Sequence, residues 1–381
     1  MRMRDKDLAR PRYNWEAALS GLSLVMEVKL DYNEFLEGKR THVPFAGFDP
    51  GSDVSGVLFP HQRDIVRWAV QGGRRAIFAA FGLGKSLMQL EIMRLIGDRE
   101  GGRQLIVCPL GVRQEFRRDA GLLGMEPVFV RRTEEVAGDG PYLTNYESIR
   151  DGRLDPNLFD AVSLDEASVL RSFGSKTYQT FLALFDQVPY RFVATATPSP
   201  NRYKELIHYA GFLGVMDTGQ ALTRFFQRDS TKANNLTLYP HKEREFWLWL
   251  ASWAGFVQKP SDLGDSDDGY DLPPIEVAWH EIPEPEDAEV PVDRDGQARM
   301  FRDATLSLSE AAREKRDTME ARIAMAKEIV DASPDDHFVL WHDLEDERRE
   351  IKRQIPDAVE VYGSQDLDER EERIVAFSNG G

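Results

Sequence analysis

The stretch Ala79-Ala80-Phe81-Gly82-Leu83-Gly84-Lys85-Ser86 decides the fold of the first part of this chain. It follows the apolar run Ala76-Ile77-Phe78 and precedes apolar residues at helical spacing, namely Leu87, Leu90, Met93 and Leu95. A strand, a glycine-containing turn and a helix in this order are the context of a phosphate-binding loop.

The residue types of this loop match the chemistry of a nucleotide site. Gly82 and Gly84 allow the backbone to turn several amide groups toward one anion, at the N-terminus of the following helix. Lys85 would place a positive charge on the outer phosphates, and Ser86 would offer its hydroxyl to Mg2+. With Leu83, these residues form the predicted binding loop for a nucleotide. An ordinary glycine turn before a helix is the alternative, because short motifs give false positives.

The composition indicates a globular protein of two or three domains. Of the 381 residues, 41% are hydrophobic and 30% are charged. No apolar stretch approaches the ~20 residues of a membrane span, and the first residues contain no apolar signal core. The single cysteine, Cys108, excludes internal disulfides and fits a reducing compartment. We therefore expect a cytoplasmic protein that contacts no membrane, and no structural zinc, since the histidines form no cluster at ligand spacing.

The acidity of the chain is confined to its last third. The net charge is −17, yet residues 260–381 carry 14 Lys and Arg against 34 Asp and Glu, while residues 1–259 carry 34 against 31. A local basic groove in the first two thirds is therefore compatible with the composition, and charge alone neither supports nor excludes a nucleic-acid partner.

The sequence divides into four segments. Residues 1–55 read as an N-terminal extension, and residues 56–215 alternate buried strands with helices, as in a parallel α/β lobe. The predicted strands cover residues 76–80, 104–108, 127–130, 142–144, 161–164 and 192–194. Residues 216–274 break this rhythm with an aromatic helical stretch around Trp247–Phe256 and a polar linker, which predict an inserted helical subdomain. We interpret the aromatic helix as a packing element rather than a platform for bases.

Residues 275–381 resume the alternation and predict part of a second α/β lobe. The expected strands are Ile275–Ile282, Phe338–His342 and Ala358–Tyr362. The expected helices are Gln297–Asp331, Glu345–Gln354 and Leu367–Phe377.

An acidic pair follows one of the buried strands of the first lobe. The run Ala161-Val162-Ser163-Leu164 ends in Asp165 and Glu166, which places two carboxylates at the carboxyl edge of a parallel sheet, beside the phosphate loop. Asp165 would hold Mg2+ through water, and Glu166 would orient and deprotonate the attacking water. A surface acidic pair that caps the next segment is the alternative.

Hydroxyl residues follow the next strand. Phe192-Val193-Ala194 leads into Thr195, Ala196 and Thr197. Thr195 and Thr197 would hydrogen-bond to the carboxylates and report whether the γ-phosphate is present. A plain turn at a strand end explains them equally well in isolation.

In this order, the motifs resemble those of superfamily-2 DEAD/DEAH-type helicases, from about residue 56 to the last residue. Leu58-Phe59-Pro60-His61-Gln62 resembles the Q motif, which implies that Gln62 reads the adenine edge. The loop resembles motif I, with Ala79 in place of the usual first glycine. Leu105–Leu110 and Leu143–Ser148 resemble motifs Ia and Ib, which implies that Pro109, Thr144 and Tyr146 line the nucleic-acid track.

Later motifs resemble the Swi/Snf-type ATPase group, in a compact form typical of phages and prophages. That group has a basic stretch and Ser-Lys after motif II, matched here by Arg171 and by Ser175-Lys176. Thr195-Ala196-Thr197-Pro198, Asn201 and Glu205-Leu206 are similar to its Thr-Gly-Thr-Pro, Asn and Glu-Leu. The resemblance therefore implies nucleic-acid contacts by Arg171, Lys176 and Asn201. It also implies two tandem RecA-like parallel-sheet lobes with the helical subdomain inserted, ATP and Mg2+ as cofactors, and DNA as partner.

Two departures from the family pattern stand out. Ser168 occupies the position of the family's histidine, so its hydroxyl would make a weaker link between nucleotide and motif III. No match to motifs V and VI follows residue 363, so we expect the second lobe to be incomplete within residues 1–381 and hydrolysis by this segment to be weak. An arginine within the segment, Arg348, Arg349 or Arg353, is the alternative source of a catalytic cation.

The sequence thus predicts a nucleic-acid-dependent ATPase motor that translocates on double-stranded DNA, with Lys85, Asp165 and Glu166 as catalytic residues. A strand-separating DEAH-type helicase or a restriction-type translocase is the alternative within the motor class. An ATP-gated assembly module without motor activity is the alternative from another class.

Overall fold

The computed structural model describes residues 45–171, 176–199, 202–228, 236–270, 274–282, 315–316, 318–378 and 380. The chain forms two compact units, residues Met1–Leu272 (unit 1) and Pro273–Gly381 (unit 2). Most of the N-terminal extension expected at residues 1–55 lies outside the described residues. Within the described part of the chain, no helix combines the length and the apolar character that crossing a bilayer requires.

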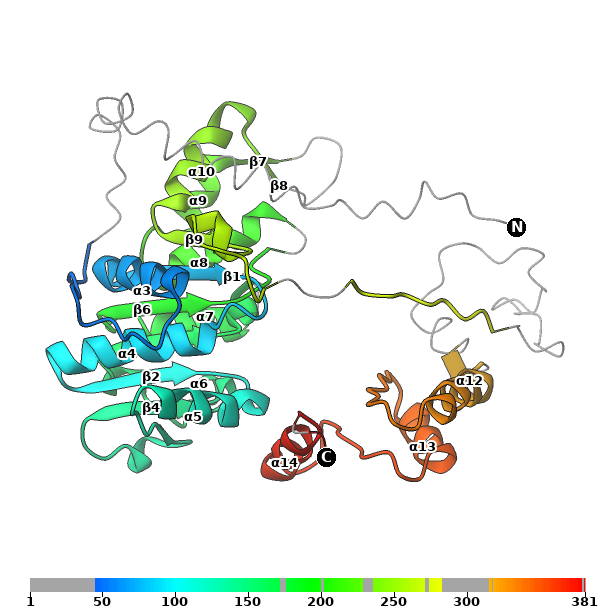
Figure 1. Cartoon of the computed structure of the whole chain (residues 1–381). Helices are drawn as coiled ribbons and strands as arrows, with labels where there is room; N and C mark the ends of the chain where they lie inside the picture. Colours follow the sequence, from blue (N-terminus) through cyan, green and yellow to red (C-terminus); the bar gives the residue numbers. More distant parts are fainter. Residues whose placement is uncertain are drawn as a thin grey trace. The chain divides into compact units, whose positions relative to one another are not determined.

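Unit 1 is built on a seven-stranded sheet in the order β3-β4-β2-β5-β6-β1-β9, and all of its pairings are parallel (Figure 1). The strands are β1 (Arg74–Ala79), β2 (Arg103–Val107), β3 (Val128–Phe129), β4 (Gly140–Thr144), β5 (Ala161–Asp165), β6 (Tyr190–Ala194) and β9 (Ala254–Val257). This confirms the α/β fold expected for the first lobe. The six strands predicted within residues 56–215 all form.

Helices cover both faces of the sheet, which a parallel sheet requires. Alternate residues of β1 enter two separate hydrophobic cores, Ala76 and Phe78 on one face, Ile77 and Ala79 on the other. The helices are α3 (Pro60–Gly72), α4 (Lys85–Glu100) and α5 (Arg113–Leu122) over the second face, and α6 (Tyr146–Arg150), α7 (Lys176–Leu184) and α8 (Leu206–Leu213) over the first.

The described part of residues 216–270 belongs to unit 1, and one of its strands, β9, lies at the edge of the seven-stranded sheet. It comprises α9 (Thr218–Phe225), a hairpin of β7 (Phe226–Arg228) and β8 (Leu236–Leu238), α10 (Glu243–Ala251), and strand β9, which pairs with β1. Phe246 and Trp253 are fully buried in the core beside β1, so the aromatic helix is a packing element, as predicted. Strand β9 was not predicted from the sequence, because Ala254-Gly255-Phe256-Val257 is short and contains a glycine, which is rare in strands.

Unit 2 contains the helices α12 (Met319–Ala332), α13 (Glu345–Gln354) and α14 (Leu367–Ser378). The last two confirm the helices predicted at residues 345–354 and 367–377, whereas most of the N-terminal half of the helix predicted at 297–331 lies outside the described residues. The three strands predicted in unit 2 are wrong for the residues that the structure describes, because none of these segments pairs with a neighbour. A second parallel-sheet lobe is therefore not evident in the part of unit 2 that the structure describes.

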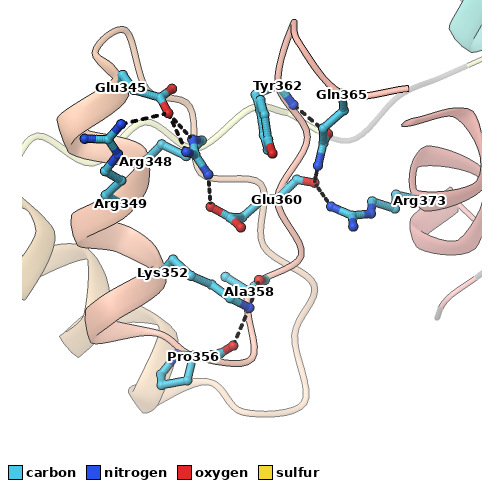
Figure 2. Close-up of polar contacts among 10 residues, drawn as sticks. All are labelled: Glu345, Arg348, Arg349, Lys352, Pro356, Ala358, Glu360, Tyr362, Gln365 and Arg373. Carbon is cyan, nitrogen blue, oxygen red and sulfur yellow. Dashed lines mark hydrogen bonds and ion pairs between the residues drawn. The ribbon is translucent and has the colours of Figure 1, made fainter. Parts of the chain in front are cut away.

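Side chains donate hydrogen bonds to backbone carbonyl groups of the third predicted strand, Ala358–Tyr362 (Figure 2). Lys352 donates to the carbonyl oxygens of Pro356 and Ala358, at 2.6 and 2.9 Å, and Gln365 donates to that of Glu360 at 3.1 Å. The carbonyls of Ala358 and Glu360 belong to alternate residues of the predicted strand, whereas that of Pro356 lies in the turn that precedes it. The donors from α13 and from the turn before α14 thus take positions that a neighbouring strand would otherwise fill.

Candidate nucleotide site

The phosphate loop connects β1 to α4 with two left-handed glycines. Gly82 has φ 81° and Gly84, the residue before α4, has φ 75°. A Cβ atom on Gly84 would lie 2.4 Å from the Nε2 atom of Gln62, whereas nothing lies within 4 Å of a Cβ atom on Gly82. Gly84 is therefore required both by backbone conformation and by the close approach of Gln62.

Gln62 belongs to α3 and connects that helix to the phosphate loop. Its side chain is buried, its Nε2 atom donates to the carbonyl oxygen of Leu83 at 3.1 Å, and its Oε1 atom accepts from the amide of Phe59 at 3.0 Å. Both ends of the amide group are thus engaged within the protein. Recognition of adenine by Gln62 stays a prediction.

The ammonium group of Lys85 lies against the loop backbone. It donates to the carbonyl oxygens of Ala79 and Ala80, at 3.1 and 3.0 Å. Burial lowers the pKa of Lys85, and the negative charges of Asp165 and Glu166 partly restore it. The charge of Lys85 therefore interacts with both predicted catalytic carboxylates, while its ammonium group is hydrogen-bonded to the phosphate loop.

Asp165 is the last residue of β5 and is held by a buried side chain of α4. Its Oδ1 atom accepts a hydrogen bond from the Nε2 atom of Gln89 at 2.8 Å. Burial raises the pKa of the Asp165 carboxyl to about 6, against the opposing effects of the Gln89 hydrogen bond and the Lys85 charge. The negative charge of Glu166 adds to the rise. A cation at this site would favour the ionised carboxylate.

Glu166 has an unusual backbone conformation and contacts all three predicted coupling residues. Its φ of 48° makes it the one residue other than glycine with a positive φ among the described residues. Its Oε1 atom accepts from the hydroxyls of Thr195 at 3.0 Å and Thr197 at 3.5 Å, and its carbonyl accepts from Ser168 at 3.4 Å. Strain of this kind concentrates at functional sites.

Sheet order explains why these residues meet. Strands β5, β6 and β1 are neighbours, with Asp165 opposite Ala194 and Ala194 opposite Ile77. The carboxyl ends of the three strands therefore lie at one edge, where ligands bind in open α/β sheets. The phosphate loop, the acidic pair and the threonine motif are assembled there.

The donor set at this edge fits Mg2+. Ser86 and Asp165 supply a hydroxyl and a carboxylate oxygen, the hard ligands that Mg2+ prefers. No group of three or more His, Cys, Asp or Glu suited to a metal ion exists in the part of the chain that the structure describes.

Two polar residues of the site were not predicted from the sequence. Gln89 contacts Asp165, and Asp119 of α5 accepts a hydrogen bond from the Ser86 hydroxyl at 2.6 Å. Gln89 could have been found from its spacing. It follows Ser86 by three residues and Lys85 by four, so all three side chains lie on one side of α4. Asp119 carried no comparable signal, since α5 joins the site only through tertiary packing.

The structure describes the side chains of three of the residues predicted to contact nucleic acid, Pro109, Thr144 and Tyr146. Thr144 and Tyr146 are buried, and their hydroxyls donate to the backbone carbonyls of Val130 at 2.7 Å and Asp165 at 2.6 Å. Pro109 is half-buried after β2. Arg171 ends a 3₁₀ turn and Lys176 begins α7, with side chains that the structure does not describe, and Asn201 lies outside the described residues.

The arginines of unit 2 differ in how they are engaged. Arg348 pairs with Glu345 and Glu360 and lies 4.2 Å from the centre of the Tyr362 ring (Figure 2). The side chain of Arg349 is 68% exposed, and its nearest carboxylate oxygens are 3.8 Å away. A new partner could therefore bind the guanidinium of Arg349 without breaking close ion pairs, whereas binding that of Arg348 would break its pairs with Glu345 and Glu360.

The chain resembles known proteins in structure but not detectably in sequence. No protein-family model matches the sequence, and no curated protein matches it. The SWI2/SNF2 ATPase core domain of Sulfolobus solfataricus has a similar structure, with TM-score 0.45 and 17% identity over 87% of this chain and 75% of that one. The same core in complex with dsDNA also gives TM-score 0.45 and 17% identity, over 57% of this chain; the alignment spans about half, 47%, of that protein.

The UvsW helicase of bacteriophage T4 gives TM-score 0.33 and 15% identity, over 40% of this chain and 57% of that one. Because these TM-scores are all below 0.5, we base the function on the residues of the site. The chain is structurally similar to SWI2/SNF2 ATPase cores and to the UvsW helicase, at low sequence identity.

Proposed function

We propose that this chain is a nucleic-acid-dependent ATPase, a motor of the Swi/Snf type that moves along double-stranded DNA. The observation that carries the proposal is the position of Glu166, which is hydrogen-bonded to Thr195 and adjoins both Asp165 and the charge of Lys85. A base, a cation and a metal-type carboxylate at one sheet edge are the parts that phosphoryl transfer to water requires.

Each side chain has a separate task in this proposal. Lys85 leaves the carbonyls of Ala79 and Ala80 to bind the outer phosphates, while Ser86 and Asp165 hold Mg2+. When bound, Mg2+ neutralises charge on the phosphate oxygens. Glu166 accepts a proton from the attacking water, with its carboxylate kept in place by Thr195.

The proposed DNA partner is supported by the order of the sequence motifs and by the charge of residues 1–259, which is not acidic. Arg171, Lys176 and Asn201 are the proposed contact residues, together with Pro109. Thr144 and Tyr146 are left out of this surface because their hydroxyls are used inside unit 1. Contacts to phosphates would make binding tolerant of sequence and sensitive to salt.

The experiment measures phosphate release with and without duplex DNA, at low and at raised salt. We expect DNA to raise the rate for the parent chain and salt to suppress the increase. Glu166→Gln lacks the proposed base and therefore serves as the blank that defines the signal. ATP binding without any response to DNA would favour the ATP-gated module, and strand displacement would favour a helicase.

A further inference from the structure

A chain of buried side chains links α4 to the acidic pair. The hydroxyl of Ser163 donates to the Oε1 atom of Gln89 at 2.6 Å, and the Nε2 atom of Gln89 donates to the Oδ1 atom of Asp165 at 2.8 Å. Ser163 and Gln89 are both fully buried. The two hydrogen bonds therefore run in one direction, from Ser163 to Gln89 and from Gln89 to Asp165.

The direction follows from the chemistry of the three groups. A carboxylate can only accept, so Gln89 must present its NH2 group to Asp165. Its carbonyl oxygen then faces Ser163, whose hydroxyl donates to it. Ser163 and Asp165 are two residues apart on one strand and therefore share a face of the sheet, the face that α4 covers.

We propose that Gln89, oriented by Ser163, is a positioning residue that sets the Asp165 carboxylate for Mg2+ at the ATP site. The hydrogen bond occupies Oδ1 and leaves Oδ2 for the metal or its water. The inference rests on the proposed function, because it assigns Gln89 a role at the same site. Partners that orient a metal ligand are typically worth ~10- to 100-fold in metal affinity.

A purely structural role for Gln89 makes a different prediction. If the side chain only fills the interface of α4 and β5, its loss would weaken the site as a whole, with or without metal. If it positions Asp165, its loss would weaken the Mg2+-dependent part alone, because the phosphate loop and Lys85 stay intact. Nucleotide binding in EDTA separates the two.

The test is a titration of the full 381-residue chain with a fluorescent ATP analogue, in EDTA and at increasing Mg2+. Gln89→Met keeps a similar volume but removes the donor, and Ser163→Ala releases the amide that Ser163 orients. Glu91→Gln is the matched control, because Glu91 is equally buried on the same helix but pairs with Arg94 and the amide of Ser55.

We expect Gln89→Met to raise the Mg2+ concentration for half-maximal enhancement ~10- to 100-fold, with unchanged affinity in EDTA. Ser163→Ala should shift it in the same direction by less, and Glu91→Gln should not shift it. An unchanged Mg2+ response in both site variants, or an equal loss of affinity in EDTA, would overturn the role of Gln89. A parent chain without Mg2+-dependent ATP binding would overturn the proposed function itself.

Discussion

Thr195 donates its hydroxyl hydrogen to Oε1 of Glu166 across 3.0 Å, which connects the end of β6 to the residue that follows β5. Thr195 is fully buried, and Glu166 holds a left-handed backbone conformation with φ 48°. If Asp165 and Glu166 were only a surface acidic pair, neither the strained backbone of Glu166 nor its fixed carboxylate would be expected. Both are well explained by a base whose position matters.

Replacement of Thr195 by valine should slow hydrolysis while ATP affinity is kept. A hydrogen bond to a charged group is worth about 1.5–3 kcal/mol, which corresponds to roughly 10- to 100-fold in rate if it acts in the transition state. Thr195→Ser keeps the hydroxyl and should stay close to the parent. Phosphate release by the three proteins checks this, and equal rates for valine and parent would remove Thr195 from the coupling.

Replacement of Glu166 by glutamine should separate binding from turnover. The amide can still accept from Thr195 but cannot take a proton from water, so the rate should fall ~10²-fold or more. Affinity for ATP with Mg2+ should persist. Glu147→Gln, an exposed position on α6, is the control. An undiminished rate for Glu166→Gln in the phosphate-release assay would place the base elsewhere.

Asp165 should make stability depend on pH when no Mg2+ is present. Burial raises the pKa of its carboxyl in the folded state to about 6, from an ordinary value of 3.8. The folded state therefore holds this proton more tightly, and the resulting stabilisation is complete below about pH 4 and lost as the pH rises through about 6.

Asp165→Asn removes this dependence, so it should stabilise the chain at pH 8 by at most about 3 kcal/mol relative to the parent. The advantage should shrink as the pH falls through 6 toward 4. Urea unfolding in EDTA at several pH values measures it, with the exposed Asp64→Asn as control. A difference that is independent of pH would contradict the raised pKa.

Gly84→Ala should cost more than Gly82→Ala. Both positions need a left-handed backbone, which costs a non-glycine residue roughly 1–2 kcal/mol. At Gly84 the new Cβ would also meet Gln62 at 2.4 Å and displace it from the loop. Urea unfolding and ATP titration of both variants check this, and equal losses would show that the contact with Gln62 is unimportant.

The sheet of unit 1 and the residues at its carboxyl edge were largely predictable, because glycine turns and buried strands are local signals. The contact of Thr195 with Glu166 followed from motif order and from the rule that parallel strands end at one edge. Gln89 could have been found from its spacing of three and four residues from Ser86 and Lys85 on α4. Asp119 was not predictable from local pattern, since tertiary packing decides which side chains of α5 reach the site. The burial of Thr144 and Tyr146 was hidden for the same reason.

Unit 2 shows the opposite outcome. The pattern of Ala358–Tyr362 predicts a strand, yet strand formation depends on a neighbour whose backbone is available for pairing. Lys352 and Gln365 take carbonyl oxygens of this segment instead, and the side chains of Val359 and Val361 are exposed. The two helices at residues 345–354 and 367–377 were predictable because a helix satisfies its own backbone.

The most direct test of the ATP site is a fluorescent-ATP titration of the parent chain and of Lys85→Ala, each with Mg2+ and with EDTA. Lys85 supplies the cation of the phosphate loop, and its charge interacts with those of Asp165 and Glu166. We predict saturable binding by the parent that Mg2+ strengthens, loss of tight binding in Lys85→Ala, and no change in the surface variant Lys259→Ala. Equal affinity of parent and Lys85→Ala, with both proteins folded, would contradict the assignment of this loop.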